Sequence, residues 1–176
     1  MAARDPGSVL DIARPRLWDR AWWPAYRAAY LGMRIWWRIC PVAHRGALVA
    51  IHCDGKLLVI RNSYRRGWSL PGGGVEPGEN SCAAAMRELR EELGLAITIE
   101  GAPIVVTGVW EGRPDTVDIF DLALTAVPEL RLDNREVIEA RFVAPANLST
   151  MMLTGPAAAY AARRWPLSAR DEHPSP

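Results

Sequence analysis

Three glutamates in the stretch GGVEPGENSCAAAMRELREELGL have the spacing of a cation site. Glu88, Glu91 and Glu92 occupy positions i, i+3 and i+4, which share one face of an α-helix. Like charges held in this way repel each other, at a cost of roughly a few tenths of a kcal/mol per pair. A hard divalent cation prefers oxygen ligands and would turn that repulsion into attraction. The spacing therefore predicts a binding site for Mg²⁺, or for Mn²⁺.

A helix from about Ser81 to Leu93 must position these carboxylates. Asn80 or Ser81 can cap its N-terminus, the run CAAAMRELREEL contains strong helix formers, and Gly94 stands where a left-handed residue ends a helix. The apolar residues on the side away from the glutamates are Met86, Leu89 and Leu93. One face is thus predicted for the core and the other for the ion, whereas an isolated acidic helix is more often a solvated surface.

A glycine-rich loop directly precedes the predicted helix. Gly72, Gly73 and Gly74 permit positive φ and close backbone approach. The loop can therefore aim a carbonyl oxygen at a cation and leave room for phosphates. Most glycine-rich stretches are only turns, so it is the position before the acidic helix that indicates a site.

The complete spacing is more specific than either feature alone. Its fixed positions are Gly73, Glu79, Arg87, Glu88, Leu89, Glu91, Glu92, Gly94 and Leu95. They reproduce the pattern G-x5-E-x7-R-E-U-x-E-E-x-G-U, in which U is a bulky apolar residue, without a departure. The chain therefore resembles the Nudix hydrolases, and the flanking strand pattern extends the resemblance over about residues 45–148.

The resemblance implies a ligand set for the metal. The carbonyl of Gly72 would coordinate it together with Glu88 and Glu92, and Glu91 would coordinate a further ion or orient water. The general base differs among members of the family. We expect it in the box helix, as Glu88 or Glu91. The more distant candidates are Glu136 and Glu111, each of which, taken singly, is more typical of an ordinary surface carboxylate.

Other positions of the motif are expected to orient the site. Arg87 would form a structural ion pair with Glu79 that steadies the loop and the helix, with a phosphate contact as the alternative. Gly73 and Gly94 would shape the loop and the end of the helix.

The substrates that the resemblance implies are nucleoside diphosphates linked to another moiety, with water attacking phosphorus. Arg61, Arg65 and Arg66 are candidate phosphate ligands, because a guanidinium matches phosphate oxygens bidentately. Trp68 is a candidate stacking residue, with core packing as the alternative. The patterns that mark particular substrates in some relatives are not reproduced, so the sequence does not select the substrate.

The remaining pattern indicates an α/β protein, a Nudix-type α/β/α sandwich with a mixed sheet. Asp54-Gly55 predicts a hairpin between two apolar runs, Gly46–Cys53 and Lys56–Arg61. Further strands are predicted over residues 96–100, 103–110, 116–127 and 137–143, with a turn over residues 111–115 and helices over residues 144–152 and 156–164. Because their separation is odd, Asp118 and Asp121 should lie on opposite faces of the sheet. We assign residues 44–166 to the hydrolase domain and residues 167–176 to a disordered tail.

Residues 1–43 form an N-terminal extension with a predicted amphipathic helix that starts at Pro24 and ends near Cys40. Its arginines recur along one stripe, as Arg20, Arg27, Arg34 and Arg38. Opposite them lie Trp22, Tyr26, Ala29, Tyr30, Met33, Trp36, Trp37 and Cys40. The aromatic face is expected to pack on the sheet or on a second copy in a homodimer, with the arginines in water. The alternative is an anionic membrane surface.

Composition limits the other classes of function. The net charge of +1 indicates no nucleic-acid partner, and the three cysteines, Cys40, Cys53 and Cys82, are expected as reduced thiols. Arginines interrupt the N-terminal segment before a secretory or membrane-spanning run can accumulate, so a cytoplasmic protein is expected. The favoured function is a Mg²⁺-dependent pyrophosphohydrolase. The alternatives are a non-catalytic nucleotide-binding module and a membrane-apposed hydrolase of a lipid-linked diphosphate.

Overall fold

The computed structural model describes residues 17–40 and 43–166. The disordered tail predicted for residues 167–176 lies outside the described residues, as does the first part of the N-terminal extension. The strands are β1 (His44–Cys53), β2 (Lys56–Asn62), β3 (Gly72–Gly74), β4 (Ile104–Trp110), β5 (Arg113–Leu124) and β6 (Val137–Val143). The helices are α1 (Leu17–Ile39), α2 (Ser81–Leu93), α3 (Pro145–Leu148) and α4 (Gly155–Arg164).

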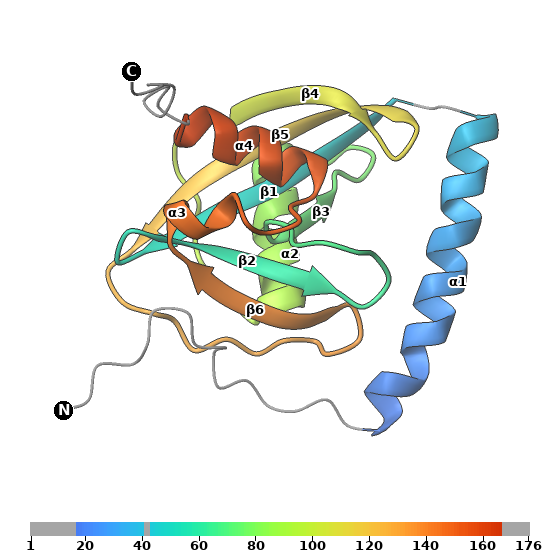
Figure 1. Ribbon diagram of the computed structural model, residues 1–176, viewed down its shortest axis with the longest axis horizontal. Coiled ribbons are helices and arrows are strands. Elements are labelled where there is room, and N and C mark those ends of the chain that lie inside the picture. Colours follow the sequence, from blue (N-terminus) through green and yellow to red (C-terminus); the bar gives the residue numbers. More distant parts are fainter. Residues whose placement is uncertain (1–16, 41–42, 167–176) are drawn as a thin grey trace, which may run out of the picture.

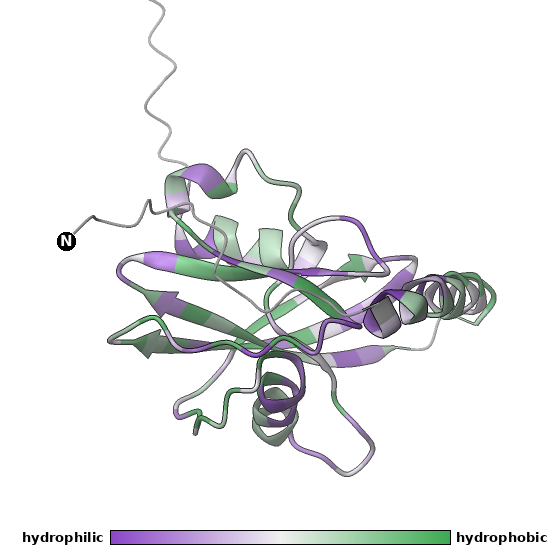
Figure 2. Ribbon diagram, turned by 90° about the horizontal axis from the view of Figure 1, so that it is seen from below, coloured by the Kyte–Doolittle hydropathy of each residue, from purple (hydrophilic) through white to green (hydrophobic). Residues whose placement is uncertain are grey.

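The strands form one mixed sheet in the order β4-β5-β1-β2-β6, with β3 paired to β1 (Figure 1). Strand β1 pairs in parallel with β5, whereas it pairs antiparallel with β2 and β3. Helix α2 covers one face of the sheet, and α3 and α4 cover the other, as the turned view shows (Figure 2). This arrangement confirms the α/β/α sandwich.

Alternating side chains of β1 supply both halves of the core. Val49 and Ile51 face the cluster that contains Leu89 of α2, and Ala50 faces the cluster that contains Tyr160 of α4. All five are fully buried. A strand buried on both faces reads as a continuous apolar run, which explains the sequence GALVAIHC.

The β1–β2 hairpin forms where Asp54-Gly55 predicted it. Asp54 has φ +49° and Gly55 has φ +71°, the paired positive values of the tight turn that suits strand twist. In the register, Cys53 lies opposite Lys56. The prediction of this hairpin from sequence is confirmed.

The β4–β5 turn is shorter than predicted. Only Glu111 and Gly112, with φ +57° and +87°, make the turn, and Arg113 already pairs with Trp110. The prediction of a turn over residues 111–115 is therefore wrong. The pairing of β1 with β5 begins at Asp115, so Pro114 lies beyond the reach of β1 and its missing N–H breaks no bond to that strand.

Two other sequence predictions fail. Residues 96–100 have no regular secondary structure, although Leu95 and Ile99 are buried beside α2. Their apolar spacing reflects packing against the helix and not a strand ladder. The helix predicted over residues 144–152 is also limited to the four residues of α3.

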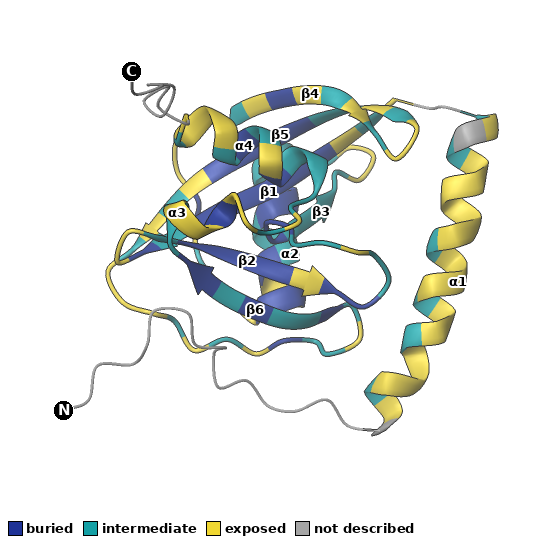
Figure 3. Cartoon of the chain, viewed as in Figure 1, coloured by how far each residue is buried: buried dark blue, intermediate teal, exposed yellow. Residues whose placement is uncertain are grey.

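Helix α1 stands apart from the sheet (Figure 1). It begins at Leu17, so the prediction that Pro24 begins the helix is wrong. Pro24 lies inside the helix and removes one backbone hydrogen bond, but the helix continues past it to Ile39. Most residues of α1 are exposed (Figure 3). Among the described residues, no helix is both long and apolar enough to cross a membrane.

Side-chain bonds attach α1 to the domain. Trp23 donates its indole N–H to the carbonyl of Asn134 at 3.1 Å, and Arg27 donates Nε–H to the carbonyl of Ser63 at 3.0 Å. Only part of the predicted aromatic face meets the domain, because Tyr30 and Trp37 contact it whereas Trp22 and Trp36 are exposed. The expectation that the arginines lie in water is wrong for Arg27.

Candidate active site

Helix α2 is fixed at both ends and along its buried side. The Asn80 side chain accepts from the N–H of Ala83 at 2.8 Å, so Asn80 is the N-cap. Gly94, with φ +68°, ends the helix in the left-handed conformation. Leu89 and Leu93 are fully buried on the side that faces the sheet. The glutamates of this helix therefore have a rigid base.

Glu92 is the most buried carboxylate of the motif, with 4% of its surface exposed. Its Oε2 accepts a hydrogen bond from the backbone N–H of Gly72 at 2.8 Å. Burial raises the pKa of Glu92 well above its ordinary value, and the neighbouring charges of Glu88 and Glu136 raise it further. The Gly72 bond opposes this shift. A divalent cation would compensate the same buried charge.

Glu88 lies against the glycine loop. A Cβ on Gly73 would stand 2.5 Å from its Oε1, so this approach requires glycine. Burial raises the pKa of Glu88, while the ion pair with Arg87 at 2.8 Å lowers it. Glu91 instead leaves 61% of its side chain exposed at the edge of the site.

Arg87 joins the loop to the helix. Its Nε and Nη2 each bond to the carboxylate of Glu79 at 3.2 Å, and Nη2 also donates to the carbonyl of Gly74 at 3.1 Å. The guanidinium holds the pKa of Glu79 below its ordinary value. The structural ion pair that the motif implied is thus present, and it leaves Arg87 engaged with protein acceptors.

The donor chemistry of this site fits a hard cation, but its ligands are not assembled around one point. Within residues 17–40 and 43–166, no three histidine, cysteine, aspartate or glutamate side chains are arranged as a metal centre. The two carboxylates have other partners here, since Glu92 accepts from the N–H of Gly72 and Glu88 accepts from the guanidinium of Arg87. The set nevertheless consists of neighbouring, mutually repelling carboxylate oxygens, which is the donor type that Mg²⁺ and Mn²⁺ select.

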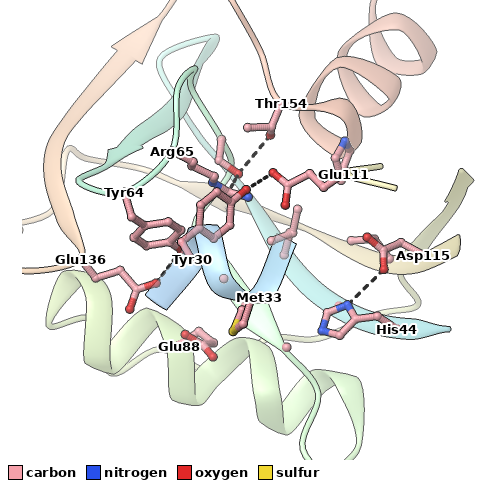
Figure 4. Close-up of a pocket in the computed structure, with 18 of the residues that line it drawn as sticks. Tyr30, Met33, His44, Tyr64, Arg65, Glu88, Glu111, Asp115, Glu136 and Thr154 are labelled. Atoms are coloured by element: carbon pink, nitrogen blue, oxygen red, sulfur yellow. Dashed lines mark hydrogen bonds and ion pairs between the residues drawn. The ribbon is translucent and has the colours of Figure 1, made fainter. Parts of the chain in front are cut away.

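A pocket of about 700 Å³ opens over the glycine loop (Figure 4). Glu88, Glu91 and the three glycines of the loop line it, whereas Glu92 lies behind this wall. Helix α1 forms the opposite wall. Its contributions are Tyr26, Ala29, Tyr30, Met33 and Trp37. This volume falls in the range of small-molecule sites.

Both distal acids line the pocket, and a tyrosine holds each of them. Tyr64 donates to Glu136 at 2.7 Å, and Tyr30 donates to Glu111. The two rings lie side by side, with centroids 4.9 Å apart, between the two acids (Figure 4). Burial raises the pKa of both tyrosines, so they remain hydrogen-bond donors at neutral pH.

A second charged group lines the pocket beyond the glycines. His44 Nδ1 lies 3.3 Å from Asp115, and Arg113 Nε lies 3.1 Å from the same carboxylate oxygen. Arg113 also lies over the ring of Trp37 on α1, 3.6 Å from its centroid. Burial and the charge of Arg113 lower the pKa of His44, and burial raises that of Asp115.

The structure brings only one of the four predicted substrate residues into the pocket. Arg65 lines it, with its guanidinium bonded to Asn62 and Ser69. The remaining three do not line it. Arg61 pairs with Glu139 at 2.6 Å. Trp68 is partly buried and packs against the core cluster that contains Tyr160.

Sequence reasoning missed the aromatic wall and the charged group around His44. The aromatic face of α1 was visible, but nothing in the sequence showed that it would pack beside the glycine loop. Tyr64 follows β2 by two residues, and nothing in the sequence around it shows that it reaches the site.

This combination of sandwich, glycine loop and acidic helix defines a family. The NUDIX domain model matches residues 42–165, and the chain belongs to that family. Helix α1 lies outside the matched residues.

The relatives differ in what their names report. Nucleoside triphosphatase NudI of Escherichia coli is 43% identical over 61 residues, which are 32% of this chain and only 38% of that relative's length. The MutT Nudix hydrolase of Burkholderia pseudomallei has a TM-score of 0.59 at 26% identity, over 68% of this chain and 96% of its own. An Ap4A hydrolase of Caenorhabditis elegans has a TM-score of 0.60 at 20% identity, over 69% of this chain and 94% of its own.

Proposed function

We propose that this protein is a pyrophosphohydrolase that requires a divalent cation, Mg²⁺ or Mn²⁺, and cleaves a phosphoanhydride bond in a nucleoside diphosphate derivative. The buried carboxylate of Glu92 and the partly buried carboxylate of Glu88, both against the glycine loop, are the observation that carries this proposal. Similar proteins are named for nucleotides that contain such bonds, among them a nucleoside triphosphatase and a UDP-X diphosphatase.

Glu88 and Glu92 are the residues that would hold the cation. When bound, the metal would neutralise phosphate charge and lower the pKa of attacking water. The protein supplies the position, because α2 is anchored in the core and the loop is tied to it through Gly72 and Arg87. Glycines in the loop allow the backbone of β1 and the carboxylate of Glu88 to approach the loop closely.

Glu136 is the residue that we assign to accept the proton of the attacking water. It lines the pocket, and its charge acts on both Glu88 and Glu92, so the three carboxylates are neighbours. Glu88 would be engaged by the metal, and Glu91 is mostly exposed. Both are therefore weaker candidates for the general base than the sequence alone indicates.

The aromatic wall of the pocket supports a nucleoside as the substrate moiety. Tyr30 and Tyr64 place their rings at the pocket. A base can stack on such rings whatever its identity, because every base presents a π face. Arg65 is placed to contact the phosphates.

A substrate panel tests the proposal. Nucleoside triphosphates, nucleotide sugars and dinucleoside polyphosphates would be assayed for phosphate or mononucleotide release with Mg²⁺, with Mn²⁺ and with EDTA. We expect metal-dependent turnover of at least one member. Failure on every member, combined with binding of a member by calorimetry, would favour the non-catalytic nucleotide-binding module.

A further inference from the structure

Helix α1 carries a continuous apolar surface on the side that faces away from the domain. Six large hydrophobic residues there have about half or more of their surface exposed, namely Trp18, Trp22, Leu31, Ile35, Trp36 and Ile39. At about 3.6 residues per turn they share an arc of about half the helix circumference with alanines, glycine and Pro24. No charged residue falls within this arc in the helix sequence LWDRAWWPAYRAAYLGMRIWWRI. We call this surface the outer face of α1.

The domain cannot cover the outer face, because α1 already uses its other side. Trp23, Tyr30 and Trp37 make the contacts to Asn134, Glu111 and Arg113. Most of the helix is coloured as exposed in Figure 3, and green segments alternate with pale and purple ones along it in Figure 2. Monomeric soluble proteins rarely expose a contiguous apolar patch of this kind, and such patches mark interaction sites.

The charges along α1 indicate which kind of partner fits. The helix contains four arginines and one acidic residue, Asp19. Asp19 points toward the domain, where Arg135 lies 3.7 Å from it. Arg20 and Arg34 follow one edge of the outer face and are exposed. A second copy that docks through its own outer face would bring more arginines to that edge, and its single acidic residue in α1, Asp19, lies on the other side of the helix. An anionic surface would instead neutralise the arginines.

We infer that the outer face of α1 docks on the surface of a lipid bilayer that contains anionic lipids. An interfacial helix of this type buries its apolar side at the boundary between headgroups and acyl chains, and tryptophan is enriched at that depth. Arginines at the edge of the apolar arc reach the headgroups. Since Tyr30 and Met33 on the same helix line the pocket, the bilayer would lie about one helix diameter, ~10 Å, from it.

Co-sedimentation of the full chain with vesicles tests this inference. The vesicles would contain phosphatidylcholine alone or equal parts of phosphatidylcholine and phosphatidylglycerol. We expect sedimentation with the anionic vesicles, weakened by salt, and little with phosphatidylcholine alone. The double variant Trp18→Glu/Trp36→Glu should bind at least about tenfold more weakly, and Arg20→Gln/Arg34→Gln should lose the preference for anionic lipid.

The matched control is Val109→Glu/Met152→Glu, which adds the same two charges at exposed apolar positions outside α1. This control should sediment like the wild type. Thermal melting of all variants would show that folding is unchanged. The inference is overturned if the wild type does not sediment, if Trp18→Glu/Trp36→Glu sediments equally well, or if phosphatidylcholine alone binds equally well.

The oligomeric state distinguishes a membrane from a second copy as the partner of the outer face. Light scattering coupled to size exclusion, without lipid, should give a monomer for the wild type. A dimer that Trp18→Glu/Trp36→Glu converts to a monomer would assign the outer face to a second copy and overturn the membrane assignment. These measurements do not involve turnover, so their result is independent of the proposed reaction.

Discussion

The backbone N–H of Gly72 donates a hydrogen bond to Oε2 of Glu92 at 2.8 Å. This bond joins the glycine loop to the last glutamate of the motif, 20 residues further along the chain. Gly72 has φ +125°, and a Cβ there would collide with the carbonyl of Ala47, so the approach depends on glycine. The loop and the helix therefore fix each other, and a carboxylate is kept buried by their contact.

Glu92→Gln is expected to stabilise the metal-free protein while it abolishes most turnover. The amide keeps an acceptor for the Gly72 N–H but removes a buried charge whose pKa the fold raises. At neutral pH, we expect the free energy of unfolding to rise on the order of 1 kcal/mol. Urea titration and steady-state kinetics would measure both effects.

Mg²⁺ provides the control for this variant. A ligand that binds only the folded state raises its apparent stability, so Mg²⁺ should raise the melting temperature of the wild type. The rise should be much smaller in Glu92→Gln. Near wild-type activity in this variant would show that the ligand assignment is wrong.

Gly73→Ala should displace Glu88 and lower kcat by about a hundredfold or more, a loss of the size seen when catalytic groups are misplaced. The added methyl would stand 2.5 Å from Oε1 of Glu88, which must move away. Gly46→Ala is the matched control on the neighbouring strand, because its Cβ would meet ordinary contacts at 3.5 Å. Equal activity of the two variants would contradict the placement of Glu88.

Local signals were sufficient to predict several elements from the sequence. Helix α2 matches its prediction from Ser81 to Leu93, because its cap, its helix formers and its terminal glycine all agree. Asp118 and Asp121 lie on opposite faces, as the strand period requires, the first bonded to Arg45 and the second to Tyr160.

The rest depends on contacts between distant segments. Nothing near Tyr30 in the sequence shows that it meets Glu111, 81 residues away. Leu95 and Ile99 directly follow α2, and their burial in the same core cluster gives an apolar spacing that resembles that of a strand. From the sequence, Arg61 and Arg65 are equally good candidates for phosphate ligands. The structure places Arg65 in the pocket and Arg61 beside Glu139, outside it. The motif thus located the acidic site but not the wall that faces it.

Glu136→Gln is expected to lower kcat by about a hundredfold or more with little change in KM, the range typical of a lost general base. The glutamine still accepts from Tyr64, so the pocket should keep its shape. Activity of the variant should recover as pH rises, because hydroxide replaces the missing base. Glu111→Gln is the control, since Glu111 lines the same pocket. A larger loss in the control would reverse the assignment.

Glu79→Gln should change how stability depends on pH in the metal-free protein. The Arg87 contact lowers the pKa of Glu79 in the folded state. The contribution of the Glu79–Arg87 ion pair to folding stability is therefore fully present above the unfolded pKa of about 4.3. It is lost as the pH falls through the lower pKa of the folded state. Chemical denaturation at several pH values should show the variant less stable at neutral pH and the difference closing in acid. A difference that does not depend on pH would contradict this account.

Tyr30→Ala should weaken substrate binding without slowing the chemical step. The ring lines the pocket beside Tyr64, and base stacking on an aromatic side chain contributes about 1–3 kcal/mol, so KM should rise by roughly 5- to 150-fold. Tyr30→Phe keeps the ring, loses the bond to Glu111, and should retain most of the affinity. Trp36→Ala on the exposed side of the same helix is the control and should leave KM unchanged in solution. If Tyr30→Ala and Trp36→Ala have equal KM values, α1 does not contribute to the substrate site.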